Sequence, residues 1–322
     1  MCTVGVVGLG LIGGSLALDL KRRGFAARTL GVEKDSVAAQ AAKTIGLVDD
    51  VVDLDTCIAQ SDIIVLAVPV GTAVKLVTYV LDRLQSGEEA LSGAFARTGT
   101  TPEIGDSRGP RWSRSDAEER ASSPDWNGKI VIDVCSTKEQ ICNAVKYHPL
   151  RKQFVSTHPM AGTEYSGPWA AQPGLFDGRA CIFCDSEESS PKALKTIEDM
   201  YAVLNMRPLY MRASQHDVHT AYVSHISHVT SFALALTVLD KEKDEKHIFD
   251  LASGGFSSTV RLAKSNADMW VPILTQNHDN VLQVMDTYID KMKAFREAVA
   301  SYDEAQIRAL IEEANKIKKI IR

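Results

Sequence analysis

The chain has 322 residues, a formal net charge of -5 and a pI of about 5.9. This length is enough for a large core and two domains, and the acidic balance without a basic face argues against a nucleic-acid partner. Its six cysteines are scattered, and Cys181 and Cys184 form a C-x-x-C pair without a second pair to complete a zinc site. We therefore expect buried reduced thiols and a cytoplasmic protein.

The beginning of the chain is apolar but has no cationic leader pattern, so we expect no signal peptide. The best candidate for a membrane span, residues 232–239, is too short to cross a bilayer. The sequence therefore predicts no membrane partner.

The first predicted strand covers residues 3–7, and a G-x-G-x-x-G pattern follows it directly and opens a helical pattern. In this pattern Gly8 permits a tight turn, Gly10 lets the backbone approach a pyrophosphate, and Gly13 allows close helix–strand packing. The helix N-terminus adds free N–H groups that suit phosphates. The residues expected at a dinucleotide are Gly8, Gly10, Leu11, Ile12 and Gly13.

The second predicted strand, residues 29–32, ends at Glu33. A carboxylate there can accept hydrogen bonds from the ribose hydroxyls of adenosine, and it would repel a 2′-phosphate. Glu33 therefore favours NAD over NADP. The neighbouring Lys34 is a cation that could tolerate the phosphate, so NADP remains an alternative.

Strand-like runs alternate with helical patterns through the first two thirds of the chain. This alternation predicts an α/β fold, with an N-terminal Rossmann-type doubly wound parallel sheet. The further strand-like runs are residues 62–68, 129–134, 154–157, 180–184 and 209–211. Residues 86–127 far exceed an ordinary connection of about 2–6 residues and are rich in polar residues, so we expect a mobile surface insertion there.

Strand signals disappear after Ser214 and helical periodicity replaces them. We therefore place a boundary near Arg212, between a dinucleotide-binding domain (1–212) and an all-α substrate and dimerisation domain (213–322). One apolar stripe in the second domain fits either a second copy of the chain or the chain's own helices, so a homodimer is a hypothesis. The stripe consists of Val281, Val284, Met285, Tyr288, Met292 and Phe295.

Ligands of open α/β sheets lie beyond the carboxyl ends of the strands. Val68 and Pro69 close one predicted strand, and Pro69 can turn the chain under a cofactor. Ser136 and Lys138 follow another strand, although Lys138 also fits a surface charge. His158 follows a third strand, and its imidazole titrates near neutral pH, so it is a candidate general base.

Histidines also gather at the start of the helical domain, at His216, His225 and His228. A zinc site is the alternative, but no His-Glu-x-x-His pattern and no cysteine partner accompany them, so we expect no metal. We expect instead a polar helix face that binds an anionic substrate.

Gly254 and Gly255 are predicted to break a helix and let the backbone approach a ligand. Arg261 would then lie on the first turns of the next helix. A guanidinium at this place is suited to bind a carboxylate bidentately, although an exposed solvated arginine is the alternative.

Together these motifs resemble the prephenate dehydrogenase family, which includes arogenate dehydrogenases. The resemblance implies a Rossmann domain and a helical dimerisation domain with the active site between them. It also implies the oxidative decarboxylation of prephenate to 4-hydroxyphenylpyruvate in tyrosine biosynthesis, with NAD or NADP reduced. The matching segments are residues 7–15, 136–138, 158–164, 216–217, 224–228 and 254–256, together with Arg261.

The resemblance also implies roles for single residues. His158 accepts the proton of the C4 hydroxyl, and Ser136 hydrogen-bonds both that hydroxyl and the histidine. Arg261 binds a substrate carboxylate, and His216 and His228 help to hold the substrate. We accordingly expect His158 to face Arg261 across the nicotinamide.

Three alternatives remain open. Arogenate carries an amine in place of the keto oxygen of prephenate, and no residue named above distinguishes the two substrates. A 3-hydroxyacid-type dehydrogenase would favour a catalytic lysine on the first helices after the Rossmann domain, where this chain has His225 and His228. A non-catalytic NAD-binding module would bind the nucleotide without turnover.

Overall fold

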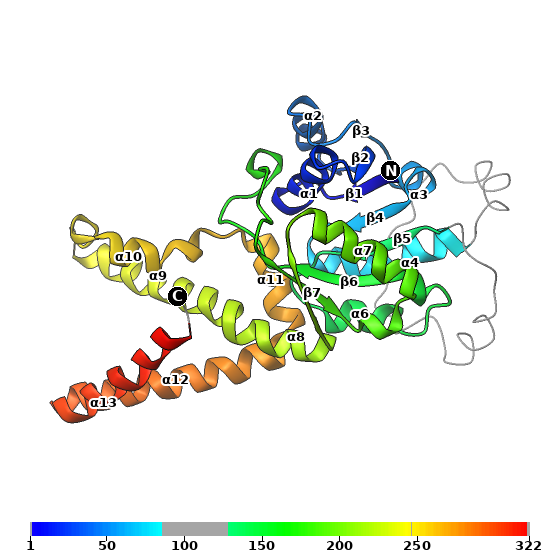
Figure 1. The fold of residues 1–322 in the computed structure, drawn as a ribbon. Coiled ribbons are helices and arrows are strands. Elements are labelled where there is room, and N and C mark those ends of the chain that lie inside the picture. Colours follow the sequence, from blue (N-terminus) through cyan, green and yellow to red (C-terminus); the bar gives the residue numbers. More distant parts are fainter. Residues whose placement is uncertain (1, 86–127, 246, 321–322) are drawn as a thin grey trace.

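The computed structural model describes residues 2–85, 128–245 and 247–320. It shows one large sheet flanked by helices, and a group of further helices that projects away from the sheet (Figure 1). The insertion expected at residues 86–127 lies outside the described residues.

The sheet has eight strands in the order β3-β2-β1-β4-β5-β6-β7-β8. The strands from β3 to β6 are parallel, as the sequence predicts. The two-residue β3 was not predicted, because it is too short to form an apolar run. The strands are β1 (Cys2–Val7), β2 (Ala26–Val32), β3 (Asp50–Val51), β4 (Ile63–Leu66), β5 (Ile130–Asp133), β6 (Phe154–Pro159), β7 (Ala180–Cys184) and β8 (Arg207–Met211).

The direction of β7 departs from the fully parallel sheet that the sequence predicts. β7 is antiparallel to β6, and β8 is parallel to β7. Parallel neighbours are usually joined by a helical crossover, whereas the segment between β6 and β7 contains only the short 3₁₀ turn Pro168–Ala170. The chain therefore returns alongside β6 in the opposite direction.

Helices cover both faces of the sheet because the strand side chains alternate between two apolar clusters. Ile63 and Val65 pack on one side and Ile64 and Leu66 on the other. The helices of the first side are α1 (Leu11–Arg22), α2 (Ser36–Thr44) and α7 (Pro191–Val203). Those of the second side are α3 (Leu54–Gln60), α4 (Val70–Gln85) and α6 (Glu139–Val145).

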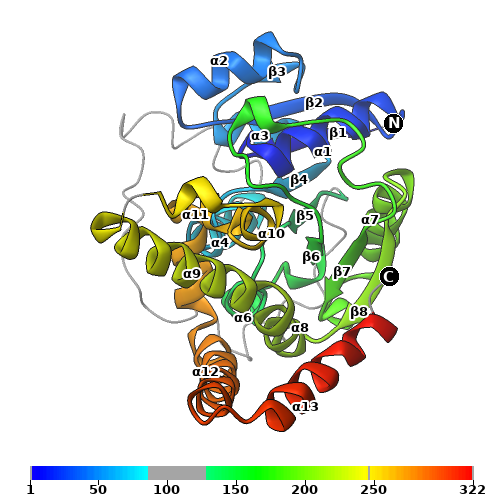
Figure 2. The ribbon, with the colours of Figure 1, turned by 90° about the vertical axis from the view of Figure 1, so that its left-hand side faces the viewer.

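The last strand ends at Met211, and the regular elements in the described residues after it are all helices. Figure 2 views the molecule from the side on which they project. A π-helical turn, Ala221–His225, joins α8 and α9, and α11 packs against α4. The helices are α8 (Ala213–Thr220), α9 (Ile226–Asp244), α10 (Gly254–Thr259), α11 (Ala267–Gln276), α12 (His278–Ala300) and α13 (Glu304–Ala314).

The helical run Ala213–Lys243 is, among the described residues, long and apolar enough to cross a membrane by length and composition alone. The sequence predicts a shorter apolar stretch, because polar residues precede residue 232. The run contains His216 and Asp217, which are buried against the sheet part of the chain. Of its most apolar window, 11% is buried inside the single chain, so packing within this chain accounts for little of its apolar character.

The apolar stripe of α12 divides into two halves. Val281 and Val284 are buried by the chain itself, whereas Tyr288 and Met292 are 42% and 53% exposed. The chain's own helices therefore cover the beginning of the stripe. Its second half leaves apolar surface available to a partner.

A buried ion pair fixes the carboxyl end of β5. Lys138 is fully buried, so it is not a surface charge, and its Nζ bonds the Asp133 carboxylate and, at 2.6 Å, the carbonyl oxygen of Thr157. Ser156 donates a hydrogen bond of 2.9 Å to the other oxygen of Asp133. Burial acts to lower the pKa of Lys138, but the Asp133 carboxylate outweighs it and raises the pKa.

We predict that Lys138→Met lowers the free energy of unfolding by about 3–5 kcal/mol, because it leaves the buried Asp133 carboxylate without its cation. Urea unfolding followed by circular dichroism measures this loss. The matched control is Lys195→Met, which removes one partner of the exposed Lys195–Asp199 pair and should cost far less than Lys138→Met. Equal small losses in both variants would contradict the structural role of Lys138.

Candidate active site

The glycine-rich turn between β1 and α1 has the three properties that its pattern predicts. Gly8 has φ +98°, and a Cβ there would lie 2.4 Å from the carbonyl oxygen of Ala67. A Cβ on Gly13 would lie 2.0 Å from the Gly8 oxygen, so helix and strand pack too closely for a side chain. A Cβ on Gly10 would meet no atom within 4 Å. The turn is therefore closed toward the protein and open at Gly10, where a ligand can approach the backbone.

The N-terminus of α1 adds hydrogen-bond donors beside this open space. Its N-cap is Gly10, which has no side chain to cap the first N–H groups. Leu11 is buried and Ile12 is half-buried and packs against the apolar core, so both can offer a ligand chiefly their backbone. These features fit a pyrophosphate.

Glu33 lies beside the same turn. Its Oε2 accepts a hydrogen bond of 3.1 Å from the backbone N–H of Leu9, and its Oε1 accepts one of 3.2 Å from Asp35. Lys34 is exposed. The carboxylate thus stands next to the glycine turn, while the cation beside it in sequence faces solvent.

The loop between β4 and α4 lies on the other side of the glycine turn. A Cβ on Gly8 would lie 3.0 Å from Cγ1 of Val68, so Val68 is a neighbour of the turn. Pro69 is exposed, and its carbonyl oxygen accepts hydrogen bonds from Thr72 and Ala73 at the start of α4. Both residues therefore lie after the carboxyl end of β4, beside the glycine turn.

His158 belongs to a strand and not to the loop that the sequence predicts after residue 157. β6 continues through Pro159 because β7 pairs with it, and His158 lies opposite Ile182. Its Nδ1 is 2.8 Å from Nε2 of His216 in α8. His158 is half-buried, whereas His216 is fully buried.

Ser136 lies at the same edge of the sheet, in the loop that follows β5, the strand next to β6. β5 and β6 are parallel, with Asp133 opposite Ser156. Ser136 comes three residues after Asp133, and His158 comes two residues after Ser156, so both lie in the same direction from this pair. Ser136 is half-buried, and the structure places it with His158 and the glycine turn at the carboxyl end of the parallel strands.

Asp217 connects the helical part to the loop after β5. Its Oδ1 is 2.7 Å from Nδ1 of His216 and accepts a hydrogen bond of 2.8 Å from the backbone N–H of Lys138. Its Oδ2 accepts one of 2.9 Å from Glu139. One buried carboxylate thus contacts the start of α6 and the histidine that touches His158.

A second group of buried polar residues supports this arrangement. Nδ2 of Asn277 donates to the carbonyl oxygen of Asp217 at 2.7 Å and lies 3.2 Å from Nδ1 of His225. The ring of His225 meets Trp270 edge to face at 5.9 Å, and the ring of His228 stacks on the same indole at 3.5 Å. The histidines are therefore held by packing as well as by hydrogen bonds.

His228 follows the π-helical turn and bonds its backbone. Nδ1 of His228 is 3.0 Å from the carbonyl oxygen of Ser224, one turn earlier, and donates to it. π-helical turns in α-helices frequently occur at functional sites, because they widen the helix and redirect side chains. Here the turn lies between His216 and His228.

Burial keeps the site histidines neutral. It lowers the pKa of His158 well below 6.5, with further lowering by His216 and Lys138. It also lowers the pKa of His216, and it lowers that of His225 to about 4. Burial lowers the pKa of His228, against the opposing effect of the Ser224 carbonyl. A neutral imidazole has a free lone pair that can accept a proton, as a base needs, while the lowered pKa makes His158 a weaker base than a solvated imidazole.

Arg261 is placed differently from the sequence prediction. Gly254 begins α10 and does not break a helix, because Ser253 is its N-cap. Arg261 follows this helix in the 3₁₀ turn Arg261–Lys264. Its Nη1 is 3.1 Å from the Glu164 carboxylate, and its side chain is 50% exposed. The guanidinium thus pairs with the loop after β6 and retains donors for a ligand.

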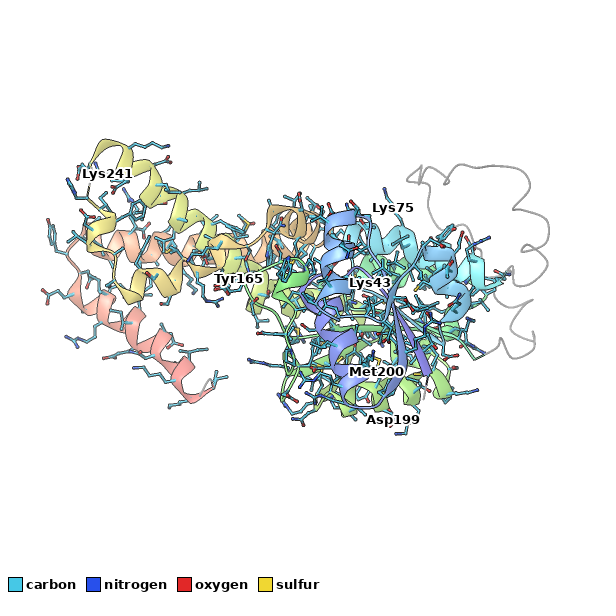
Figure 3. The ribbon with its side chains drawn as sticks, turned by 90° about the horizontal axis from the view of Figure 1, so that it is seen from above. Lys43, Lys75, Tyr165, Asp199, Met200 and Lys241 are labelled. Atoms are coloured by element: carbon cyan, nitrogen blue, oxygen red, sulfur yellow. The ribbon has the colours of Figure 1, made fainter. Side chains whose placement is uncertain are left out.

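We expected Arg261 to face His158, but in this structure Arg261 bonds the loop that follows β6. Arg261 contacts Glu164, six residues after His158, and its charge lowers the pKa of His228. Figure 3 shows Tyr165, the neighbour of Glu164, at the junction between the sheet part and the projecting helices. Arg261 therefore reaches the loop that continues from His158 and lies near His228, without touching His158 itself.

Sequence reasoning missed three supporting residues. Asp217 stood next to His216 in a noted motif, but nothing in sequence showed that it reaches α6. Trp270 and Asn277 lie in helical patterns without any distinguishing signal. Within the described ranges, no three His, Cys, Asp or Glu side chains gather in a way that could hold a metal ion.

Two family models match the chain. One described as "Prephenate dehydrogenase, nucleotide-binding domain" matches residues 16–89 and 126–210, and one described as "Prephenate dehydrogenase, dimerization domain" matches residues 212–313. Together they cover most of the chain.

Individual proteins show the same similarity. The prephenate dehydrogenase of Bacillus subtilis (strain 168) is 28% identical over 94% of this chain and 71% of its own length. The cyclohexadienyl dehydrogenase of Zymomonas mobilis is 25% identical over 99% of this chain and 96% of its own length. The fold matches a crystal structure of the Aquifex aeolicus prephenate dehydrogenase with hydroxyphenyl propionate and NAD+, at a TM-score of 0.77, 23% identity and coverage of 100% and 99%.

We predict that the free energy of unfolding falls with decreasing pH, from about pH 6.5 toward pH 4. His216 and His225 are buried and neutral in the folded chain. Since their folded pKa values lie below those of the unfolded chain, the unfolded state binds more protons in this range. Each can contribute up to about 1.4 kcal/mol per pH unit.

Urea unfolding at about pH 7, 6 and 5 measures this dependence. His225→Gln should make it less steep by the share of one histidine. The control is His219→Gln, which changes an exposed histidine of α8 and should leave the slope as it is. An identical slope in His225→Gln would contradict the role of His225.

Proposed function

This chain belongs to the prephenate dehydrogenase family, and on that premise we propose that it converts prephenate to 4-hydroxyphenylpyruvate, CO₂ and NADH, a step of tyrosine biosynthesis. One observation carries the proposal. A neutral, half-buried histidine, His158, lies at the same sheet edge as a glycine turn that is open toward a ligand. A base next to a dinucleotide site is what the removal of a hydride and a proton from an alcohol requires.

NAD is the expected cofactor, and the residues fit it. The open space at Gly10 and the uncapped N-terminus of α1 suit the pyrophosphate. Glu33 can accept hydrogen bonds from the adenosine ribose and disfavours the 2′-phosphate of NADP. When bound, NAD accepts a hydride from C4 of the substrate.

His158 is proposed to take the proton of the C4 hydroxyl as C4 becomes a carbonyl carbon. The bond between the ring and its carboxylate then breaks, CO₂ leaves, and the electron pair of that bond makes the ring aromatic. His158 can return its proton to the resulting phenolate oxygen. A positioned base contributes about 10²–10⁴-fold to such a step. Ser136, at the same edge, is proposed to hydrogen-bond the hydroxyl.

Arg261 is proposed to bind a carboxylate of the substrate. Half of its side chain is exposed, and its present partner is the Glu164 carboxylate. An incoming carboxylate would share or replace that partner. Tight binding of the departing carboxylate would oppose its loss, so we expect Arg261 to contribute to binding more than to the chemical step. His228 is proposed to contact the substrate nearby.

Arogenate is the alternative substrate. The chain is also similar to a cyclohexadienyl dehydrogenase, and arogenate differs from prephenate only by an amine in place of the keto oxygen. The described site residues do not distinguish the two substrates, since the Glu164 carboxylate beside Arg261 could also meet an amine. We keep prephenate as the first choice because both family models and the Bacillus subtilis relative are described as prephenate dehydrogenases.

We further propose that the enzyme is a homodimer. The helical region matches a dimerisation domain, and the second half of the α12 stripe remains exposed in the single chain. The partner would cover Tyr288 and Met292. We expect a cytoplasmic enzyme, because the cysteines of the described residues are free thiols. We expect its other partners to be small molecules.

The decisive experiment is NADH formation, followed by absorbance, with prephenate and with arogenate and with NAD and with NADP. We expect the highest kcat/KM with prephenate and NAD. A higher value with arogenate would establish the alternative substrate. Nucleotide binding without turnover of either substrate would leave a non-catalytic NAD-binding module.

We predict that His158→Asn lowers kcat by about 10²-fold or more and leaves NAD binding intact, because the amide cannot accept the hydroxyl proton. Steady-state kinetics and calorimetric titration with NAD measure the two effects. An unchanged kcat would remove His158 from the role of base.

We predict that Arg261→Ala raises KM for prephenate by about tenfold or more, the loss of roughly 1.5–3 kcal/mol from a charged hydrogen-bonded contact, with a smaller effect on kcat. Arg261→Lys should recover part of this loss, because it keeps the charge without the paired donors. A fall in kcat with KM intact would contradict the binding role.

A further inference from the structure

We propose that Asp217 and His216 are positioning residues that fix the proton of His158 on Nδ1, so that Nε2 of His158 carries the free lone pair that faces the substrate. The proposal deepens the proposed function and depends on His158 being its base. It assigns Asp217 a role, and it changes the role of His216 from holding the substrate to orienting another histidine.

Asp217 determines which atoms donate and which accept in this chain of hydrogen bonds. Backbone N–H groups can only donate, and two of them, from Lys138 and Glu139, point at the two carboxylate oxygens at 2.8 and 2.9 Å. Asp217 is therefore an acceptor in both bonds and serves best as an ionised carboxylate. Its contact of 2.7 Å with His216 then requires the proton to lie on Nδ1 of His216.

The proton position on His216 in turn determines the proton position on His158. Burial keeps His216 neutral, so a proton on its Nδ1 leaves Nε2 without one. That Nε2 can only accept, and its partner at 2.8 Å is Nδ1 of His158. Nδ1 of His158 therefore carries the proton. Since His158 is also neutral, its Nε2 has a free lone pair.

Both ring nitrogens of His216 are thus used inside the protein. One bonds Asp217 and the other bonds His158, and the residue is fully buried. His216 has no nitrogen left for a substrate. After His158 takes up a proton on Nε2, its positive ring remains bonded to His216, whose other side meets the negative carboxylate. Asp217 therefore also favours the protonated form of the base.

The same carboxylate links this effect to the docking of the helices. Asp217 lies in α8, while Lys138 and Glu139 belong to the loop and helix after β5. Asn277, between α11 and α12, additionally holds the carbonyl oxygen of Asp217 at 2.7 Å. His158 therefore acquires its base tautomer only when the helical part is seated on the sheet.

Nitrogen-15 NMR of the histidine-labelled wild-type protein tests the tautomers without any substrate. Among the eight histidines, the signals of His158 and His216 can be assigned with His158→Asn and His216→Gln, because each variant removes one set of signals. We expect His158 and His216 to show a protonated Nδ1 and an unprotonated Nε2 near neutral pH. A protonated Nε2 on His158 would overturn the proposal, whatever the activity.

Kinetics of two His216 variants test the consequence. In His216→Gln the amide oxygen can still accept from His158, so we expect kcat to fall by less than about tenfold and the His158 tautomer to persist. In His216→Leu no acceptor remains, so we expect kcat to fall by about 10²-fold or more, as for loss of the required tautomer in catalytic triads, with NAD binding unchanged. His219→Gln, three residues along α8 and exposed, is the matched control.

The outcomes separate the two proposals. A kcat of His216→Leu within threefold of wild type would overturn the positioning role, while activity of the wild type would still support the proposed function. A wild type without turnover of either substrate would overturn the proposed function, while the NMR result would stand on its own. If His216→Leu does not fold, the wild-type spectrum and His216→Gln still decide.

Discussion

The site depends on one buried carboxylate, Asp217, that receives donors from two parts of the chain. Two backbone N–H groups at the start of α6 and the ring of His216 all meet it within 2.9 Å. A buried carboxylate costs free energy unless such donors satisfy it. If the helical part moved away from the sheet part, Asp217 would lose two donors, and the N–H groups of Lys138 and Glu139 would lose their acceptor. Precise placement of His158 follows from this constraint.

The local sequence was enough to predict those residues whose position depends on the backbone of their own segment. The glycines after β1 could be assigned because the pattern already states their tasks: Gly8 and Gly13 leave no room for a Cβ, and Gly10 leaves its backbone open to a ligand. His158 could be located because carboxyl ends of parallel strands share one edge. The change from strands to helices after Met211 was equally visible in the periodicity.

Residues that act over long distances in the sequence could not be predicted in the same way. Asp217 and Lys138 are 79 positions apart, and Asn277 is 60 positions from Asp217. The π-helical turn before Ile226 leaves no compositional mark, and Gly254 resembles a helix breaker although it starts a helix. The direction of β7 depends on how the segment after Pro159 returns, which strand propensity does not encode.

The antiparallel pairing of β7 has a consequence for how this protein can vary. β6 stays hydrogen-bonded past the point where its parallel neighbour β5 stops, and the backbone N–H of Met160 still bonds Ala180 at 2.8 Å. His158 consequently sits in a ladder that is bonded on both sides. The segment 161–179 leaves this ladder after Met160 and rejoins it at Ala180, and its second half is tied to α1, because Phe176 is buried in the core and the backbone N–H of Gly174 bonds Asp19. Glu164 lies in the first half, before the 3₁₀ turn Pro168–Ala170. A change of length in that first half would therefore alter the surroundings of Glu164 more than those of the imidazole.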